Sequence, residues 1–117
     1  LTNQGTPTAA AEVYDAVANT FSGAGSMTTA RANQKAVHLP NNRVLLVGGA
    51  NGAILTPNPL ATGEIYDGQT NTWSAGPSLN LARAGAVAFP TPHGQVHVMG
   101  GGTTTGQIAR VCEWYYY

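Results

Sequence analysis

Short apolar runs separated by turn-forming residues dominate the hydrophobic pattern of this chain. Two runs, Arg43–Val47 and Gln95–Met99, are each followed by a pair of glycines, and each is preceded by a further short run, Lys35–Leu39 or Ala84–Phe89. Runs of this length, bounded by turn signals, predict β-strands. No segment keeps a helical period, and Ala9–Ala11 is too short for a helix, so the pattern predicts an all-β fold.

Turn-forming residues divide the rest of the chain into strand pairs. Asp67–Asn71 lies between strands predicted to begin at Glu64 and at Thr72, and Asp and Asn side chains readily bond to their own backbone. Residues 50–62 contain two prolines and predict a loop. Thr103–Gly106 predicts a shorter loop at the corresponding place further along the chain.

The pattern repeats along the chain. Residues 12–31 align with residues 64–83 at an offset of 52 without a gap, and Glu, Tyr, Asp, Asn, Thr, Ser, Ala and Arg recur. The double glycines Gly48-Gly49 and Gly100-Gly101 share this offset, and a third copy begins at Glu113. A repeat of this period is typical of propellers and solenoids.

These residues resemble the kelch motif. Its unit has an Arg before the first strand, two glycines after the second, Glu-x-Tyr-Asp in the third and Trp at the start of the fourth. The resemblance covers about residues 12–115 and implies β-propeller blades, each a four-stranded antiparallel sheet, of the kind found in secreted bacterial kelch proteins and galactose-oxidase-type propellers. We expect the repeated Glu and Arg to form a structural ion pair or backbone anchor. The matching residues, all expected to be structural, are Glu12, Tyr14, Asp15, Arg31, Gly48, Gly49, Glu64, Tyr66, Asp67, Trp73, Arg83, Gly100, Gly101 and Glu113, with Phe21 in place of a Trp.

The repeat divides the chain into three parts. Residues 1–30 are predicted to hold the third and fourth strands of a first blade, residues 31–82 a complete blade, and residues 83–117 three strands of a further blade. A propeller needs typically four to eight blades, so we expect an incomplete propeller that belongs to a longer one or associates with copies of itself. We expect apolar side chains near its two open faces, namely Tyr66, Trp73, Leu46 and Val98.

The composition excludes several classes of partner. Five Lys and Arg balance five Asp and Glu, and charged residues make up 9% of the chain, so no basic patch is available for nucleic acid. No apolar run approaches the roughly 18 residues of a membrane helix. The single cysteine cannot form an internal disulfide. Few charges and many Thr, Asn and Gly residues lead us to expect a secreted or cell-surface protein.

No catalytic constellation, metal site or cofactor site is predicted. The three histidines lack ligand spacing: His93 lies in a turn and is expected to be solvated, and His97 is expected to be a packed or interface residue. Cys112 is expected to be a buried small hydrophobe. A copper-radical oxidase would need a Tyr–Cys crosslink and convergent histidines, whereas Cys112 and Tyr115–Tyr117 lie along one predicted strand.

By the resemblance, the loops between second and third strands share one face with the links between blades, and that face commonly binds partners. Its neutral hydrogen-bonding groups suit sugars or uncharged peptide groups better than phosphate. We therefore expect a binding scaffold for a protein or a glycan. The alternatives are the propeller part of a secreted carbohydrate-active or copper-oxidase-like enzyme, and a structural repeat that assembles into rings or fibres. The candidate binding residues are Asn33, Asn51, Thr56, Asn58, Thr103, Thr104 and Gln107.

Overall fold

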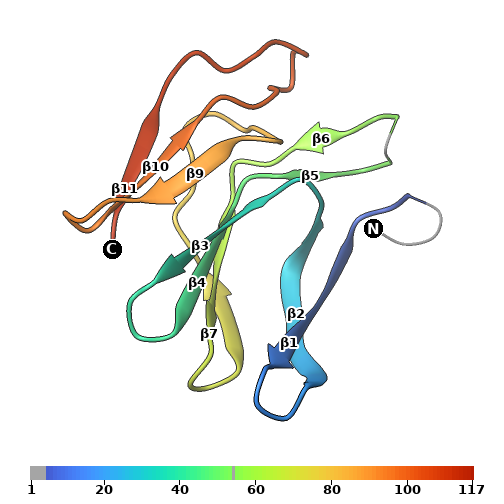
Figure 1. Ribbon diagram of the computed structural model, residues 1–117. Coiled ribbons are helices and arrows are strands. Elements are labelled where there is room, and N and C mark those ends of the chain that lie inside the picture. Colours follow the sequence, from blue (N-terminus) through green and yellow to red (C-terminus); the bar gives the residue numbers. More distant parts are fainter. Residues whose placement is uncertain (1–4, 54) are drawn as a thin grey trace.

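The fold is all-β, as the sequence predicts. The computed structural model describes residues 5–53 and 55–117, which form eleven strands and no helix. Three of the four antiparallel sheets lie side by side (Figure 1), and the described residues extend 21 Å along their shortest axis. Within these ranges, accordingly, no helix has the length and apolar character needed to cross a membrane.

The middle sheet is a complete propeller blade. Its strands are β3 (Lys35–Leu39), β4 (Arg43–Val47), β7 (Gly63–Asp67) and β8 (Thr72–Ala75). They lie in the order β3-β4-β7-β8, and each pair is antiparallel. Each strand lies within one residue of the position that the hydrophobic runs and turn signals predict, because short apolar runs and tight turns are local properties of the sequence.

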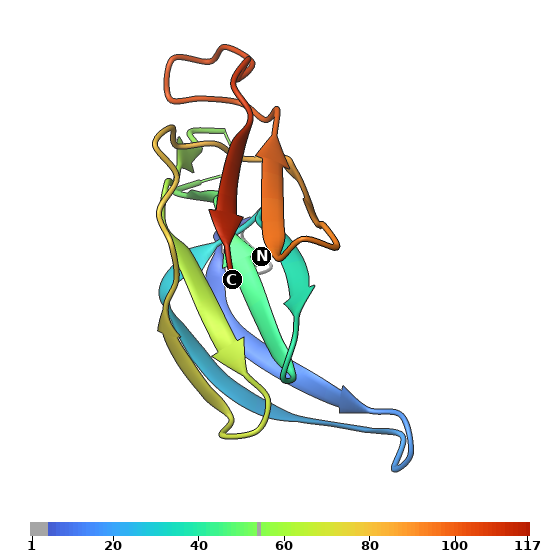
Figure 2. The same ribbon diagram turned by 90° about the vertical axis from the view of Figure 1, so that its left-hand side faces the viewer.

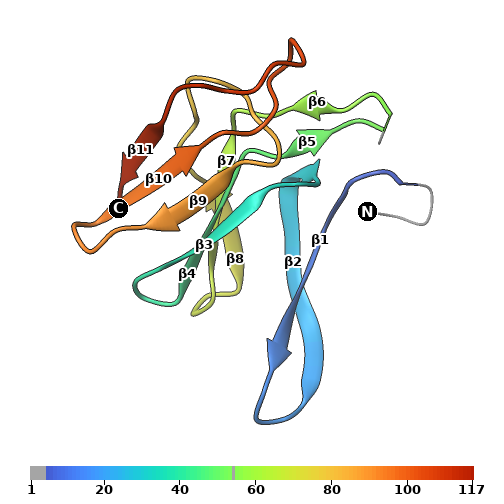
Figure 3. The same ribbon diagram turned by 45° about the horizontal axis from the view of Figure 1, so that its top comes forward.

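Partial sheets flank this blade. On one side β1 (Thr8–Asp15) and β2 (Thr20–Arg31) form a hairpin, and on the other β9 (Val87–Pro90), β10 (Gln95–Met99) and β11 (Glu113–Tyr116) form a sheet of order β11-β10-β9. The strands β3 and β9 contact each other, as do β2 and β8 (Figure 3). The turn of the β1–β2 hairpin projects beyond the turns of the middle sheet (Figure 2).

The predicted loop 50–62 contains more regular structure than the sequence indicates. It includes a small hairpin of β5 (Ala50–Asn51) and β6 (Asn58–Pro59). Ala50 also exchanges two backbone hydrogen bonds, of 2.8 and 2.9 Å, with Ala32. In the next repeat Ala84 exchanges equivalent bonds with Gly102. The strand predicted to begin at Ala84 therefore begins at Val87, where regular pairing of β9 with β10 starts. Long-range pairings of this kind leave no local pattern in the sequence.

The main core lies between the middle sheet and the three-stranded sheet. Leu39 and Val96, one from each sheet, are both fully buried. Tyr115 and Tyr117 are partly buried and pack against this core. The buried members of the cluster come from both sheets and from the residue before β9, and are Val37, Leu39, Leu45, Val47, Ala86, Val96 and Val98.

The prediction that Val98 lies near an open face is wrong. Val98 is 3% exposed because its side of β10 faces the middle sheet, and Leu46 is buried as well. The opposite side of the three-stranded sheet has no neighbour among the described residues, and alternation along each strand places other side chains there. The exposed apolar residues of these strands are Val87, Phe89, Met99, Trp114 and Tyr116.

Two further expectations concern residues with reactive side chains. His97 packs between Phe89 and Trp114, with ring centroids 5.7 and 6.4 Å apart, and is the packed residue that the sequence predicts. His93 is exposed, also as expected. Cys112, expected to be buried, is exposed. It precedes β11 rather than lying within it, and β11 pairs with β10 alone, so nothing in the described chain covers the thiol.

Candidate binding surface

A buried arginine holds the two ends of the first long loop together. Arg31 is 2% exposed, and its guanidinium donates hydrogen bonds to the carbonyl oxygens of Gly48, at 2.8 Å, and Thr62, at 2.9 Å. These two residues begin and end the segment between β4 and β7. The same guanidinium forms an ion pair of 2.9 Å with Glu64. The loop that carries the β5–β6 hairpin is therefore anchored at its base.

The next repeat reproduces this arrangement around Arg83. Its guanidinium donates to the carbonyl oxygens of Gly100, at 3.2 Å, and Val111, at 2.9 Å, and pairs with Glu113 at 2.8 Å. Arg83 is fully buried. The ion pair that the repeated Glu and Arg lead us to expect is therefore present in both repeats, and each Arg closes the base of a loop.

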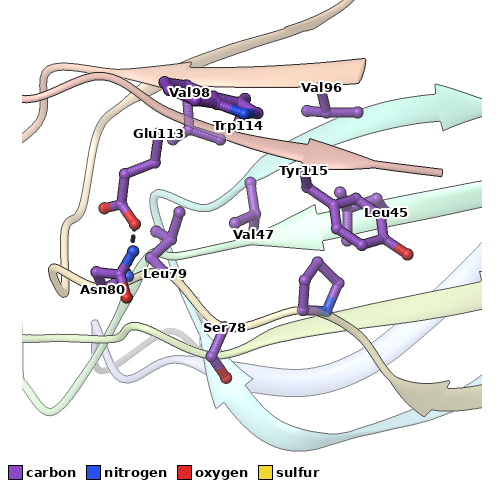
Figure 4. A pocket seen from close by; sticks show the side chains of 11 residues that line it. Leu45, Val47, Ser78, Leu79, Asn80, Val96, Val98, Glu113, Trp114 and Tyr115 are labelled. Atoms are coloured by element: carbon purple, nitrogen blue, oxygen red, sulfur yellow. Dashed lines mark hydrogen bonds between the residues drawn. The ribbon is translucent and has the colours of Figure 1, made fainter. Parts of the chain in front are cut away.

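Each paired carboxylate also accepts backbone hydrogen bonds from the segment that precedes its blade, the end of β2 for Glu64 and the link after β8 for Glu113 (Figure 4). Glu64 accepts hydrogen bonds from the amides of Thr28, at 2.6 Å, and Thr29, at 3.2 Å. Burial raises the pKa of Glu64, but these amides and the guanidinium of Arg31 outweigh it, so that the pKa lies below its ordinary value. Glu64 is thus held as a carboxylate at neutral pH.

The other two repeated glutamates differ in their surroundings. Glu113 accepts bonds from the amides of Asn80 and Leu81, as Glu64 does from its own link. Glu12 is exposed, and within the described ranges it forms no ion pair.

The loop side chains predicted for binding fall into two groups. In the first loop Asn51 and Asn58 lie together, because the Nδ2 of Asn58 donates a 2.9 Å hydrogen bond to the Oδ1 of Asn51. Thr56 is exposed in the turn of the same hairpin. Asn33 lies in the link next to this loop and lines a small hollow with Ala50. The structure therefore brings four of the seven predicted residues to one region.

The second loop holds the other three. The amide of Thr103 donates to the carbonyl oxygen of Gln107 at 2.8 Å, which closes a tight turn around the exposed Thr104. The hydroxyls of Thr103 and Thr105 are 3.0 Å apart. An open hollow follows this loop along residues 103–111 and reaches Leu81.

Both loops lie at one end of the molecule, opposite the tight turns of the β1–β2, β3–β4 and β7–β8 hairpins (Figure 1). This end also carries aliphatic side chains that the sequence reasoning did not assign to a surface. Leu55 is 90% exposed, Ile108 72% and Val111 55%. Arg110, also exposed, adds a cation beside them. The sequence does contain a signal for these exposed residues. They are apolar residues within segments that predict loops, where no core can bury them.

The surface offers hydrogen bonds and apolar contacts rather than reactive groups. In residues 5–53 and 55–117, no group of three or more His, Cys, Asp or Glu side chains is placed to hold a metal ion. The two buried ion pairs each join one Glu to one Arg whose donors are directed at loop carbonyls. Their role is to support the loops.

Comparisons with known proteins agree with the repeat geometry. Residues 31–80, the complete middle blade together with its flanking links, match the family model of the kelch motif. An F-box/kelch-repeat protein of Arabidopsis thaliana is 34% identical over 71 residues, which cover 61% of this chain and 15% of that protein. The chain thus spans about one seventh of that relative. Kelch repeats generally mediate protein interaction. The anchored middle blade and the matching motif thus identify residues 31–80 as a kelch motif.

Proposed function

We propose that the loops anchored by Arg31 and Arg83 form the binding surface of this kelch-type interaction scaffold, and that its ligand is a protein. The observation that carries the proposal is the combination of a fixed base with an exposed, mixed surface. Each loop is held at both ends by a buried guanidinium. The loops therefore lose little conformational entropy when they bind a partner.

The exposed aliphatic side chains favour a protein over a glycan. Protein interfaces have an apolar centre surrounded by polar residues. Leu55 and Ile108 supply apolar side chains, and neighbours such as Asn58, Thr104 and Gln107 supply neutral donors and acceptors. A sugar-binding surface would use the same polar groups without needing the aliphatic ones.

A photo-cross-linking residue at the exposed position Thr104 tests this proposal. Proteins captured by the chain with this cross-linker alone are identified by mass spectrometry. They are compared with those captured when the same chain also carries Leu55→Asp/Ile108→Asp. We expect the variant to lose its specific partners, because a charge in a desolvated contact is costly. Val17→Asp is the matched control, because Val17 is 99% exposed in the β1–β2 turn, far from the loops.

Unchanged capture by the double variant would contradict the proposal. A glycan array tests the second candidate function, which is glycan binding. Selective binding that is lost in Asn58→Ala, but kept in Leu55→Asp/Ile108→Asp, would indicate a glycan ligand held by the asparagine pair.

A further inference from the structure

The β5–β6 hairpin of the first loop carries the only Asn-Gly pair in the sequence, Asn51-Gly52. Asn51 is the last residue of β5, and Gly52, which is exposed, has a φ of 92°. An asparagine followed by glycine is prone to cyclise, because glycine has no side chain to keep its backbone nitrogen away from the asparagine Cγ. This pair therefore holds an electrophilic carbon and a nitrogen nucleophile in adjacent residues.

The backbone amide of Gly52 is available as the attacking group. In residues 5–53 and 55–117 it donates no hydrogen bond. Gly68, which follows Asp67, differs in this respect, because its amide donates a 2.9 Å hydrogen bond to the carbonyl oxygen of Asn42. An amide held in this way must break its hydrogen bond before it attacks a carbonyl carbon. The fold thus leaves one of these two glycine amides free and engages the other.

Three other asparagines contrast with Asn51. Asn58 precedes Pro59, whose nitrogen carries no hydrogen, so Asn58 cannot react by this route. The Oδ1 atoms of Asn19 and Asn71 each accept a hydrogen bond from a tyrosine hydroxyl, at 2.7 and 2.8 Å. Both are followed by threonine, whose branched side chain crowds the backbone nitrogen.

A side-chain hydrogen bond restrains Asn51. The Nδ2 of Asn58 donates a 2.9 Å hydrogen bond to its Oδ1, and the two residues are also cross-strand partners. This bond holds the carboxamide in one orientation. The pairing around it is short, because β5 and β6 contain two residues each, and so short a ladder opens readily. The restraint therefore slows cyclisation without preventing it.

We infer that Asn51-Gly52 is a self-modification site, at which the folded chain deamidates and Asn58 slows the reaction. The nitrogen of Gly52 attacks the Cγ of Asn51, and a bond forms between these two atoms. The bond from Cγ to Nδ2 breaks, and Nδ2 leaves as ammonia with the amide proton of Gly52. Water then opens the resulting succinimide ring at either of its carbonyls, which gives aspartate or isoaspartate.

The reaction changes the surface of the first loop. Either product adds a negative charge to a chain whose formal net charge is zero. Isoaspartate also lengthens the main chain of β5, which disturbs its pairing with Asn58 and Pro59. An effect on ligand binding rests on the proposed function, whereas the conversion itself needs no ligand.

Incubation of the folded full chain at mildly alkaline pH tests the inference. Tandem mass spectrometry of its peptides measures deamidation at each asparagine, and enzymatic methylation of isoaspartate identifies the product. We expect Asn51 to convert at least about tenfold faster than any other asparagine. Asn51→Gln should remove this early isoaspartate signal, because glutamine would have to close a larger ring.

Asp67→Asn is the matched variant, because it creates a second Asn-Gly pair whose glycine amide is hydrogen-bonded. In the folded chain position 67 should deamidate about tenfold more slowly than Asn51, and in denaturant the two sites should react at similar rates. Asn58→Ala should speed the conversion of Asn51 by about threefold or more, since it removes the restraint. Gln69→Ala is the control for a remote exposed side chain and should leave the rate unchanged. Circular dichroism shows that each variant keeps the fold.

Conversion of Asn51 no faster than that of the other asparagines in the folded chain would overturn the inference, as would equal rates at positions 51 and 67. A rate that Asn58→Ala leaves unchanged or lowers would contradict the role of Asn58. These rates are measured without a ligand, so their failure is distinct from a failure of the cross-linking experiment, which bears on the proposed function.

Discussion

The α-carbon of Gly48 faces the carbonyl oxygen of Arg83 so closely that a Cβ on Gly48 would lie 2.6 Å from that oxygen. Gly48 has a φ of 66°, and its repeat partner Gly100 has a φ of 69°. A Cβ on Gly100 would meet nothing within 4 Å. The two glycines therefore share a backbone conformation but differ in what lies against them, because the link at Arg83 packs onto the first glycine pair.

Alanine at these two positions separates backbone strain from steric contact. Both substitutions should cost about 1–2 kcal/mol for the left-handed conformation. Gly48→Ala should cost at least about 1 kcal/mol more than Gly100→Ala, since the link must move. Urea unfolding of both variants measures the difference, and equal costs would show that the link moves freely.

Removing the guanidinium from a buried ion pair should be strongly destabilising. In Arg31→Met the Glu64 carboxylate stays buried without its counter-ion, and we expect a loss of about 3–5 kcal/mol in the free energy of unfolding. Arg43→Met is the control: Arg43 donates an exposed hydrogen bond to Pro40 and forms no ion pair in the described chain, so the change should stay within about 0.5 kcal/mol. Similar losses in the two variants would contradict the anchoring role of Arg31.

Acid should weaken the fold through Glu64. Its pKa in the folded state lies below the ordinary value of 4.5, so the unfolded chain takes up this proton at a higher pH than the folded chain does. The contribution is complete above about pH 4.5 and is lost as the pH falls towards the folded pKa. Urea unfolding at a series of pH values that starts at neutral pH and falls below the ordinary value should show this decline. Glu64→Gln should flatten it, and Glu12→Gln should not; a slope unchanged by Glu64→Gln would assign the decline to other carboxyls.

The hydrogen bond from Trp73 to Ala24 joins the middle blade to the first hairpin. Trp73→Phe keeps an aromatic ring but removes the indole N–H that donates this bond, and should cost about 1 kcal/mol. Trp73→Ala also leaves a cavity and should cost about 3–5 kcal/mol. Phe21→Ala, at a ring that is 69% exposed, should cost much less. Thermal unfolding followed by circular dichroism checks this order, and a Phe21→Ala cost equal to that of Trp73→Ala would contradict it.

The exposure of Cys112 gives a rapid chemical check. A thiol reagent such as a maleimide should modify the folded chain without denaturant, because the side chain is open to solvent. The rate should match that of the chain in denaturant within about tenfold. Protection by several orders of magnitude would show that another part of the molecule covers Cys112.

The strands and the anchors are predictable from sequence because their causes are local or repeated. The apolar run Arg43–Val47 and the glycines after it predict β4 and its turn. The recurrence of Glu and Arg in the repeats predicts an ion pair or backbone anchor, and both ion pairs are present. The resemblance to the kelch motif also implies that the two loops share one end of the molecule.

Exposure is harder to predict because it depends on which sheets are neighbours. Val98 and Trp114 lie on opposite faces of one sheet, and only the placement of the middle blade decides that Val98 is buried while Trp114 is open. Cys112, expected to be buried in a strand, precedes β11 and is exposed. The apolar residues of the binding surface, Leu55 and Ile108, resemble core residues until the loop is seen to project from the sheets.

The hydrogen bonds that Glu64 accepts from Thr28 and Thr29 affect the order in which the molecule unfolds. Because a carboxylate in the middle blade binds the end of β2 in the hairpin before it, neighbouring repeats stabilise each other, as in a one-dimensional array with nearest-neighbour coupling. Glu12 forms no equivalent ion pair within the described chain. The β1–β2 hairpin should therefore unfold first and exchange its amide hydrogens fastest. Opening should then advance inward blade by blade, with each coupling acting as a barrier to the next.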